Sequence, residues 1–338
     1  MTKLQKQSID SEDLSKILQA LPEVPLIDAK IRSAFLSEAP TLQTVSNYLY
    51  STGGKHLRPA LCVLSAKCFN LQKTDERVIN AAAAIELIHH ASLLHDDIID
   101  NSLTRRKQPS PFAKYGLPAT LLAGDFLYLR AFGLCITLTE GIVKEFERSC
   151  LNLTEGEMLE TPLYNERHSL ESALQIARKK TASLFTLAAV TGTHLAEANQ
   201  EVIEEMRLFG ENLGVAFQIL DDILDVTSTT EIMGKKPGID LHERKPSCIN
   251  VLWLNSAAPL AKTLLTPPAT DDWSTFIPKA LKELKASPII SEAQNLAADF
   301  VKKGEQHLQN AIQIAPTTSE EAAKALHYLL NYSLKRNN

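Results

Sequence analysis

Apolar residues recur at intervals of three and four positions along four long stretches of the chain, which is the spacing of a buried or amphipathic helix. The stretches are residues 75–100, 118–138, 169–195 and 200–225. Gly, Pro, Asn or a His-Ser pair bounds each of them, as is typical of helix ends. Helices of this length bury their apolar faces by packing against one another, so the pattern predicts an all-α helical bundle.

Residues 257–272 interrupt this pattern with three prolines. A surface loop is predicted there, because helical sequence resumes beyond it without a change of composition. We therefore expect a single domain over residues 1–338. Its motif-bearing core would cover about residues 40–250, and further C-terminal helices would cover 273–338.

Composition agrees with a globular helical protein and narrows its function. The chain has 338 residues, of which 44% are hydrophobic and 6% aromatic, with 13 Gly and 16 Pro. Lys and Arg total 35 against 40 Asp and Glu, which gives a formal net charge of -5. This balance offers no basic excess for nucleic acid, so nucleic-acid binding is disfavoured.

The cysteines and the first residues indicate the compartment. The five cysteines form no C-x-x-C pair, and their odd number argues against a disulfide framework and against structural zinc. Residues 1–20 lack the apolar run of a secretion signal and the Arg-rich character of a transit peptide, and no apolar stretch is long enough to span a membrane. We expect a cytoplasmic protein whose only membrane contact is peripheral.

Two D-D-x-x-D segments lie within the predicted helices. They consist of Asp96, Asp97 and Asp100, and of Asp221, Asp222 and Asp225. On a helix each set gathers on one side, where like charges raise one another's pKa values unless cations neutralise them. One such segment is also typical of a solvated acidic face, but both copies interrupt strongly apolar helices, where unpaired charge is costly. Hard oxygen ligands select Mg²⁺, which usually adds phosphate oxygens of a substrate, so the pair predicts a phosphorylated ligand bridged by magnesium.

Basic residues flank both acidic segments, as a phosphorylated ligand requires. They are Lys55 and Arg58 in G-G-K-H-L-R-P, Arg105, Arg106 and Lys107 after the first acidic segment, Lys180, and Lys235, Lys236 and Lys245 after the second. Any one of them is also typical of a solvated surface. Neither a P-loop nor a G-x-G-x-x-G motif occurs, so nucleotide binding has no support.

Six segments, taken in order, resemble the motifs of trans-type, head-to-tail polyprenyl diphosphate synthases. They are G-G-K-H-L-R-P-A-L (53–61), L-L-H-D-D-I-I-D with R-R (93–106), G-D-F-L-Y-L-R-A-F (124–132), K-T-A-S-L (180–184), F-Q-I-L-D-D-I-L-D (217–225) and G-K-K-P-G-I-D-L (234–241). One motif alone would be weak evidence, whereas six in the family's order are specific. The segment beyond residue 250 matches the family only loosely.

The resemblance implies an all-α homodimer of the isoprenoid synthase type, with a central cavity where the acidic segments bind about three Mg²⁺ ions. These ions would hold an allylic diphosphate, such as farnesyl diphosphate, and stabilise its diphosphate as it leaves. The double bond of isopentenyl diphosphate would attack the allylic cation, and loss of a proton would complete one isoprene extension. Apolar walls would keep water from the cation.

The resemblance also assigns roles to matching positions. The metal ligands are Asp96, Asp97, Asp100, Asp221, Asp222 and Asp225. Arg105, Lys180 and Lys235 hold the allylic diphosphate, Lys245 also binds substrate, and Lys55, Arg58, His89 and Arg106 hold the diphosphate of isopentenyl diphosphate. Thr181 and Gln218 offer oxygen dipoles to the developing cation, and Phe217 lines the same cavity. Because His89 adjoins His90, core packing is the alternative role for either histidine. His95 has a buried hydrogen bond as its alternative role.

Product length is expected from the side chains one helical turn before the first acidic segment. Ala91 and Ser92, five and four positions before Asp96, are small, whereas synthases with short products are expected to carry an aromatic residue there. The resemblance therefore favours a long all-trans product, octaprenyl diphosphate, for quinone side chains. Phe132 is a candidate floor of the product cavity, with ordinary core packing as its alternative. The alternative product is shorter, a farnesyl or geranylgeranyl diphosphate.

Four residues depart from the family's usual pattern. Lys107 stands where glycine is common, Glu160 where glutamine is common, and Arg244 and Ser247 where glycine and threonine are common. None of these changes removes a metal ligand. Arg244 adds bulk and charge to a loop expected to close over diphosphate, so we expect altered substrate affinity or turnover.

Three other functions compete with this interpretation. A metal phosphohydrolase is suggested by the neighbouring histidines, but it leaves the second acidic segment unused. A non-catalytic subunit of a heteromeric prenyl synthase is suggested by the departures, although such a subunit is expected to lose Asp ligands that are all retained here. A terpene cyclase would use D-D-x-x-D without needing the basic residues assigned to isopentenyl diphosphate.

Overall fold

The computed structural model describes residues 21–69, 75–228 and 236–335, which form an all-α structure as predicted. The first part contains α2 (Glu23–Ala34), α3 (Pro40–Ser51), α4 (Leu57–Cys68), α5 (Glu76–Ile99), the short strands β1 (Thr104–Arg105) and β2 (Gln108–Pro109), α6 (Pro111–Cys135) and α7 (Glu140–Leu159). The second part contains α8 (Leu170–Ala177), the π-helical turn η1 (Arg178–Ala182), α9 (Ser183–Leu195), α10 (Gln200–Thr227), α12 (Ile239–Glu243), α13 (Cys248–Asn255), the 3₁₀ helix η2 (Pro259–Leu265), α14 (Phe276–Ala286), α15 (Ile289–Ile314) and α16 (Glu320–Lys335).

The two helices that carry the acidic segments begin where the sequence predicts them. α5 begins after Asp75, whose carboxylate accepts the backbone N–H of Arg77 at 2.7 Å. α10 begins after Asn199, whose side chain accepts the N–H of Val202 at 2.9 Å. Such caps satisfy donors that have no partner inside the helix, which fixes each starting residue.

Three predicted elements differ in detail from the structure. α6 begins at Pro111 rather than residue 118, because Gly116 has a φ of 79° and joins two helical segments across a kink. The helix predicted over 169–195 is divided by the π-helical turn η1. The predicted loop over 257–272 contains the 3₁₀ helix η2.

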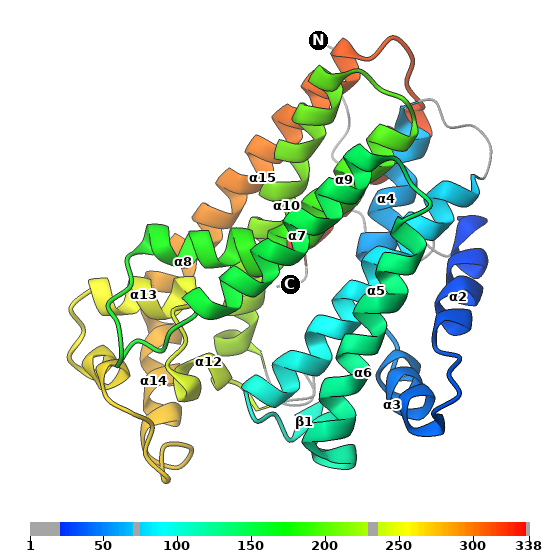
Figure 1. Ribbon diagram of the computed structural model, residues 1–338. Coiled ribbons are helices and arrows are strands. Elements are labelled where there is room, and N and C mark those ends of the chain that lie inside the picture. The colour runs from blue at the N-terminus through cyan, green and yellow to red at the C-terminus, as the bar shows by residue number, and fades with distance from the viewer. Residues whose placement is uncertain (1–20, 70–74, 229–235, 336–338) are drawn as a thin grey trace.

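Long helices pack side by side through the molecule (Figure 1). α5 packs along α6, α10 packs along α9 and α15, and α4 contacts both α9 and α16. The shorter helices α8, α12, α13 and α14 gather toward one end, where α5 and α10 also end (Figure 1). None of the helices in the described ranges combines the length and hydropathy that crossing a membrane requires.

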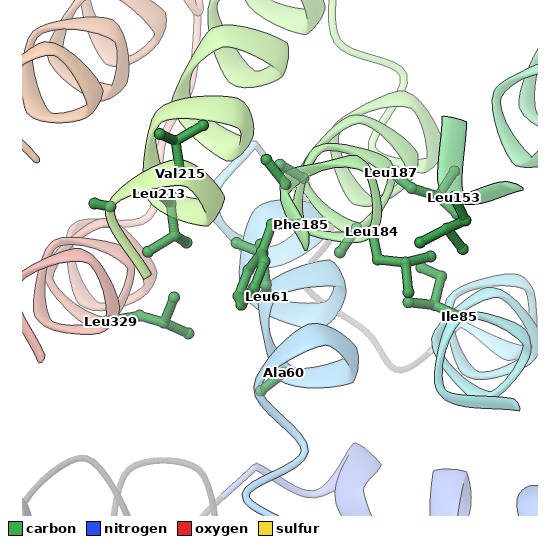
Figure 2. Packing of buried hydrophobic residues seen from close by; sticks show 14 of the residues in the cluster. Ala60, Leu61, Ile85, Leu153, Leu184, Phe185, Leu187, Leu213, Val215 and Leu329 are labelled. Atoms are coloured by element: carbon green, nitrogen blue, oxygen red, sulfur yellow. The ribbon is translucent and has the colours of Figure 1, made fainter. Parts of the chain in front are cut away.

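Figure 2 shows apolar side chains from several helices meeting in the core. Leu61 of α4 and Phe185 of α9 are fully buried, and Leu213 of α10 packs in the same cluster. Burial of such apolar surface is the main favourable contribution to folding. The core therefore joins α4, α9 and α10.

Two glycines allow close approach around η1. A Cβ on Gly156 of α7 would lie 2.8 Å from the Cβ of Lys179, and a Cβ on Gly214 of α10 would lie 2.3 Å from the Cα of Ala182. Both distances are shorter than real side chains tolerate, so only glycine fits. The π-helical turn is thus packed closely against α7 and α10.

Candidate active site

A cavity of about 300 Å³ opens where α5 and α10 end. Its lining includes Asp96, Asp100, Asp221, Asp222 and Asp225 from the acidic segments, together with Arg58, His89, Ser92, Arg105, Lys180, Thr181, Phe217, Gln218 and Lys245. Positions far apart in the sequence therefore meet around one space. Polar and apolar residues share its walls, as suits a ligand with a charged head and a hydrocarbon tail.

Both acidic segments occupy the last turns of their helices. Asp96 lies near the C-terminal end of α5, and Asp221 lies near that of α10. The negative end of the helix dipole disfavours carboxylates at such positions. Burial, followed by the charges of Glu157 and Asp100, raises the pKa of Asp96 to about 7, although Lys180 opposes the shift. A bound cation would relieve this repulsion.

Asp97 does not face the cavity, although it was expected among the metal ligands. Consecutive helical residues point about 100° apart, so the side chain that follows Asp96 is directed elsewhere. The buried Asp97 carboxylate accepts a hydrogen bond from Arg105 Nε at 2.7 Å. In this structure Asp97 therefore orients Arg105, which does line the cavity.

Hydrogen bonds fix the carboxylates of the second acidic segment. Asp222 accepts the Gln218 side-chain amide at 2.8 Å and the Cys248 backbone N–H at 2.9 Å. Asp225 accepts the backbone N–H of Asp240 at 3.1 Å, which ties α12 to α10. Burial, followed by the charge of Asp240, raises the pKa of Asp222 well above its ordinary value.

Two partly buried lysines contact carboxylates around the cavity. Lys180 Nζ lies 2.6 Å from Glu160 and 2.7 Å from Glu157, and Lys245 Nζ lies 3.1 Å from Asp100. Burial alone would lower the pKa of Lys180, but nearby carboxylates, Glu160 first, raise it above its ordinary value. The pKa of Lys245 is raised for the same reason. Both side chains are therefore ammonium ions, which bind phosphate oxygens well.

A second polar group centres on Arg58. Its guanidinium lies 4.6 Å from the centroid of the Phe185 ring, and its buried Nε has no hydrogen-bond partner among the described residues. Burial lowers the pKa of Arg58 to about 10. Burial, followed by the charge of Arg58, lowers the pKa of His89 well below its ordinary value. A buried donor without a partner is costly, so a bound anion would stabilise this group.

Arg106 lies close enough to His89 to affect its pKa, but neither Arg106 nor Lys55 is among the cavity-lining residues. Arg106 donates a hydrogen bond to Thr52 Oγ1 at 3.4 Å, and a Cβ on Gly54 would lie 3.5 Å from its guanidinium. Lys55 Nζ hydrogen-bonds the hydroxyl of Tyr332 in α16. The G-G-K segment and the R-R turn are therefore neighbours in the fold.

Thr181 and Gln218 join the π-helical turn to α10. The Thr181 hydroxyl donates a hydrogen bond to the Gln218 amide oxygen. Phe217 precedes Gln218, and its ring centroid lies 5.3 Å from that of Phe185. All three residues predicted to face the reacting carbons thus line the cavity.

The residues predicted to set product length occupy different environments. Ser92 lines the cavity, whereas Ala91 is fully buried in the core. Phe132 is 38% exposed on α6 and is not brought to the cavity, because its side of the helix faces outward. Leu184 of α9 lines the cavity and groups with Leu153 of α7 in the core (Figure 2).

His90 and His95 make structural contacts rather than line the cavity. His90 Nδ1 hydrogen-bonds the Glu86 carbonyl at 2.9 Å, and His95 Nε2 hydrogen-bonds the Leu121 carbonyl at 3.2 Å. Only His89 of these three histidines is among the lining residues. The histidine cluster that a phosphohydrolase would need is therefore not assembled here.

Sequence reasoning missed two acidic residues of the cavity. Asp240 and Glu160 both line it. Asp240 lies in the quoted segment 234–241, so its position in that motif was a usable signal. Glu160 was noted only as a departure, and nothing in the sequence showed that it pairs with Lys180. Lys235, predicted to hold the allylic diphosphate, lies outside the described residues and stays a prediction.

Lys107 and Ser247, two further departures from the family's usual pattern, are compatible with the local backbone. Arg106 and Lys107 have φ values of 51° and 65° and form the turn between β1 and β2. Glycine at the Lys107 position would adopt that conformation without strain, which accounts for its usual presence. Ser247 caps α13 by accepting the N–H of Asn250 at 3.3 Å, as a threonine would.

The acidic segments provide an all-oxygen donor set. Within the described ranges, no three His, Cys, Asp or Glu side chains come close enough to enclose a metal ion by themselves. Mg²⁺ commonly takes one or two carboxylates and completes its shell with water and phosphate oxygens. The buried carboxylates with raised pKa values therefore fit Mg²⁺ ions bridged by a phosphorylated ligand.

Known proteins of similar sequence share this site-bearing region. The family model described as polyprenyl synthetase matches residues 39–272. The geranylgeranyl diphosphate synthase of Sulfolobus acidocaldarius is 33% identical over 328 residues, which cover 90% of this chain and 94% of that protein. The octaprenyl diphosphate synthase of Haemophilus influenzae is 30% identical over 336 residues, which cover 99% of this chain and 100% of that protein.

A solved structure has the same fold. The polyprenyl synthase from Caulobacter crescentus, complexed with calcium and isoprenyl diphosphate, matches with a TM-score of 0.89 and 27% identity over 99% of this chain and 100% of that one. This confirms the predicted isoprenoid synthase fold. The chain belongs to the polyprenyl synthetase family and is a prenyltransferase that makes a prenyl diphosphate.

Proposed function

We propose that this synthase condenses isopentenyl diphosphate with an allylic diphosphate in a Mg²⁺-dependent reaction and extends the product to octaprenyl diphosphate. One observation carries the proposal: carboxylates from the ends of α5 and α10 line one cavity together with Lys180, Lys245 and Arg105. Acidic groups that attract cations and basic groups that attract phosphate therefore surround the same space.

Lys180, Lys245 and Arg105 would bind the allylic diphosphate. Negative charge develops on this group as its bond to carbon breaks, so cations held in place stabilise the transition state more than the substrate. Mg²⁺ ions held by the two acidic segments would supply further positive charge at the same group. Asp97 keeps the Arg105 guanidinium oriented for this contact.

Arg58, His89, Lys55 and Arg106 would bind the diphosphate of isopentenyl diphosphate. The Nε donor of Arg58 that lacks a partner among the described residues supports this assignment. A phosphate oxygen would satisfy that donor and offset the cost of burying it. The two diphosphates would then lie in separate parts of the site.

The remaining lining residues would protect the reacting carbons. Thr181 directs its hydroxyl hydrogen to Gln218, so its oxygen lone pairs are available to a developing cation. Leu93, Leu184 and Phe217 supply apolar surface to the cavity. Such walls exclude water, which would otherwise quench the cation.

The small side chain of Ser92 in the cavity lining supports a long product. A shorter geranylgeranyl product is the second candidate, and two observations favour it. The cavity of about 300 Å³ is small for a long hydrocarbon tail, and Leu184 closes part of its wall. The relatives of this chain include synthases named for both lengths.

We also propose a homodimer formed through the outer face of α6 and α7. Large apolar side chains are exposed there: Leu129 on α6 is 72% exposed, Ile136 directly after α6 is 80% exposed, and Met158 on α7 is 78% exposed. Apolar surface of this extent on neighbouring helices usually marks an interface. A second copy would cover it with an identical surface.

A cytoplasmic location is proposed from the cysteines. All five are free thiols, as is typical of a reducing compartment. The apolar product would pass to a membrane through peripheral contact and there serve quinone side chains.

The test is incubation of the purified chain with Mg²⁺, labelled isopentenyl diphosphate and farnesyl diphosphate, followed by sizing of the dephosphorylated product. Octaprenol as the final product is expected. A stop at geranylgeraniol would refute the long-chain proposal, and no extension would favour the non-catalytic subunit. A chelator should abolish turnover, and added Mg²⁺ should restore it.

A further inference from the structure

Arg244 carries a buried charge directly behind the candidate site. Its side chain is 1% exposed, and its guanidinium contacts Asp272 Oδ2 at 2.6 Å. Nε donates to the Thr266 carbonyl at 3.1 Å and Nη1 to the Leu241 carbonyl at 2.6 Å. The guanidinium also lies 4.8 Å from the centroid of the Phe276 ring. A buried charge is tolerated only with such partners in place, so the contacts define one arrangement.

These contacts fasten segments that are distant in the sequence. Leu241 is in α12, Thr266 follows η2, and Asp272 precedes α14. The backbone carbonyl of Arg244 also accepts the N–H of Leu163, in the connection between α7 and α8, at 2.9 Å. Arg244 thereby joins four parts of the chain around the end of α12.

Lys245, which follows Arg244 in the chain, lines the cavity. Lys245 Nζ lies 3.1 Å from Asp100 and 3.0 Å from Glu243. The Lys245 backbone N–H donates to the Asp240 carbonyl at 3.0 Å, and the Asn250 side chain donates to the Lys245 carbonyl at 2.9 Å. These bonds fix the loop on the side that faces the cavity, and the contacts of Arg244 fix it on the side that faces the protein interior.

The backbone at Arg244 adopts a conformation that is unusual for an arginine. Its φ is +58°, in the left-handed region where glycine is favoured and other residues are strained. The hydrogen bonds and ion pair of the guanidinium offset this backbone strain only when the loop has the conformation seen in the structure. An arginine here therefore selects one loop conformation, whereas a glycine would permit several.

We propose that Arg244 and Asp272 are positioning residues, whose ion pair holds Lys245 at the diphosphate-binding end of the cavity. This inference rests on the proposed function, because Lys245 is assigned to the allylic diphosphate there. Neither residue lines the cavity, so their effect on the reaction passes through the loop. A purely structural role would instead stabilise the fold without changing how the substrate binds.

Asp272→Asn tests the proposal, because it removes the charge of the pair and leaves every cavity residue in place. With the allylic diphosphate varied, kcat/KM should fall by about tenfold or more, since a small misplacement of a binding group is enough for such a loss. The KM for isopentenyl diphosphate should stay unchanged. Hydrogen exchange of the amides of residues 240–247 should become faster in the variant.

The matched control is Glu23→Gln, which breaks the ion pair of another buried carboxylate. Glu23 is 2% exposed in α2 and lies 2.9 Å from Lys67 Nζ, on the opposite side of the molecule from α12 (Figure 1). Both variants should lower the melting temperature, but the control should change neither the allylic kcat/KM nor exchange in residues 240–247. Equal kinetic effects in the two variants, or no change in Asp272→Asn, would overturn the proposal.

Two variants of Arg244 refine the result. Arg244→Gly fits the positive φ and should reproduce the loss seen in Asp272→Asn, whereas Arg244→Lys keeps the charge and should retain part of the activity. Exchange of residues 240–247 needs no turnover. An inactive wild-type chain would therefore refute the proposed function, while unaltered exchange would refute the positioning of the loop.

Discussion

Lys180 Nζ lies 2.6 Å from Glu160 Oε2, so the lysine proposed to hold the allylic diphosphate is already paired with a carboxylate. The same carboxylate lies 3.8 Å from Lys245 Nζ. A diphosphate must therefore compete with Glu160 for both ammonium groups. This residue is one of the departures from the family's usual pattern, in which glutamine is common.

Glu160→Gln should lower the KM for the allylic diphosphate by about fivefold, because it removes a competing charge while keeping a similar shape. The KM for isopentenyl diphosphate should not change. Glu155→Gln is the matched control, since Glu155 pairs with Lys179 on the other side of the π-helical turn. Steady-state kinetics with each substrate varied would check this. A higher allylic KM in Glu160→Gln would show that Glu160 positions Lys180 instead.

Asp96→Asn and Asp221→Asn should each lower kcat by about a hundredfold or more, because each removes a charged oxygen proposed to hold Mg²⁺. Burial raises the pKa of Asp96 to about 7, so its ionised form is unfavourable in the fold and the asparagine should raise the melting temperature without metal. Asp299→Asn, at an exposed position of α15, is the control. Loss of activity together with a lower melting temperature would point to misfolding.

His56→Asn should destabilise the fold in a pH-dependent way. The hydrogen bond from His56 Nδ1 to Glu86, 2.9 Å long, raises the pKa of His56 above its ordinary 6.5, although burial opposes it. The pair therefore contributes fully below pH 6.5, and the contribution is lost as the pH rises through the raised pKa. The difference should be about 1 kcal/mol at most, because the imidazole is one-third exposed and solvent screens it.

Urea unfolding across pH would measure this difference between wild type and His56→Asn. In a Glu86→Gln background the difference should shrink at every pH. A stability gap that is independent of pH would contradict the prediction, because it would mean that the charge on His56 contributes nothing.

Ser92→Phe should shorten the final product, because the ring would occupy the cavity that the growing chain enters. Phe132→Ala should leave product length unchanged, since Phe132 lies on the exposed side of α6. Sizing of dephosphorylated products would check both variants. A longer product from Phe132→Ala would restore Phe132 as the floor of the product cavity.

The sequence predicts the helices and the acidic segments well, because apolar spacing and D-D-x-x-D are local patterns. It could not predict that Asp97 turns to Arg105, since this depends on the rotation of α5 in its packed setting. Arg244 was expected to add bulk and charge to a loop that closes over diphosphate, and the sequence did not show that its guanidinium points into the protein toward Asp272. The direction of such a side chain depends on contacts between segments that are distant in the sequence.

The π-helical turn Arg178–Ala182 determines the directions in which two consecutive lysines point. Lys179 contacts Glu155, whereas Lys180 lines the cavity. A π-helical turn holds one more residue than an ordinary turn, and deleting one residue there would rotate the following side chains by about 100°. The directions in which Lys180 and Thr181 point therefore depend on the number of residues in this turn. A deletion that rotated them away from the cavity would inactivate the site although every functional side chain was still present.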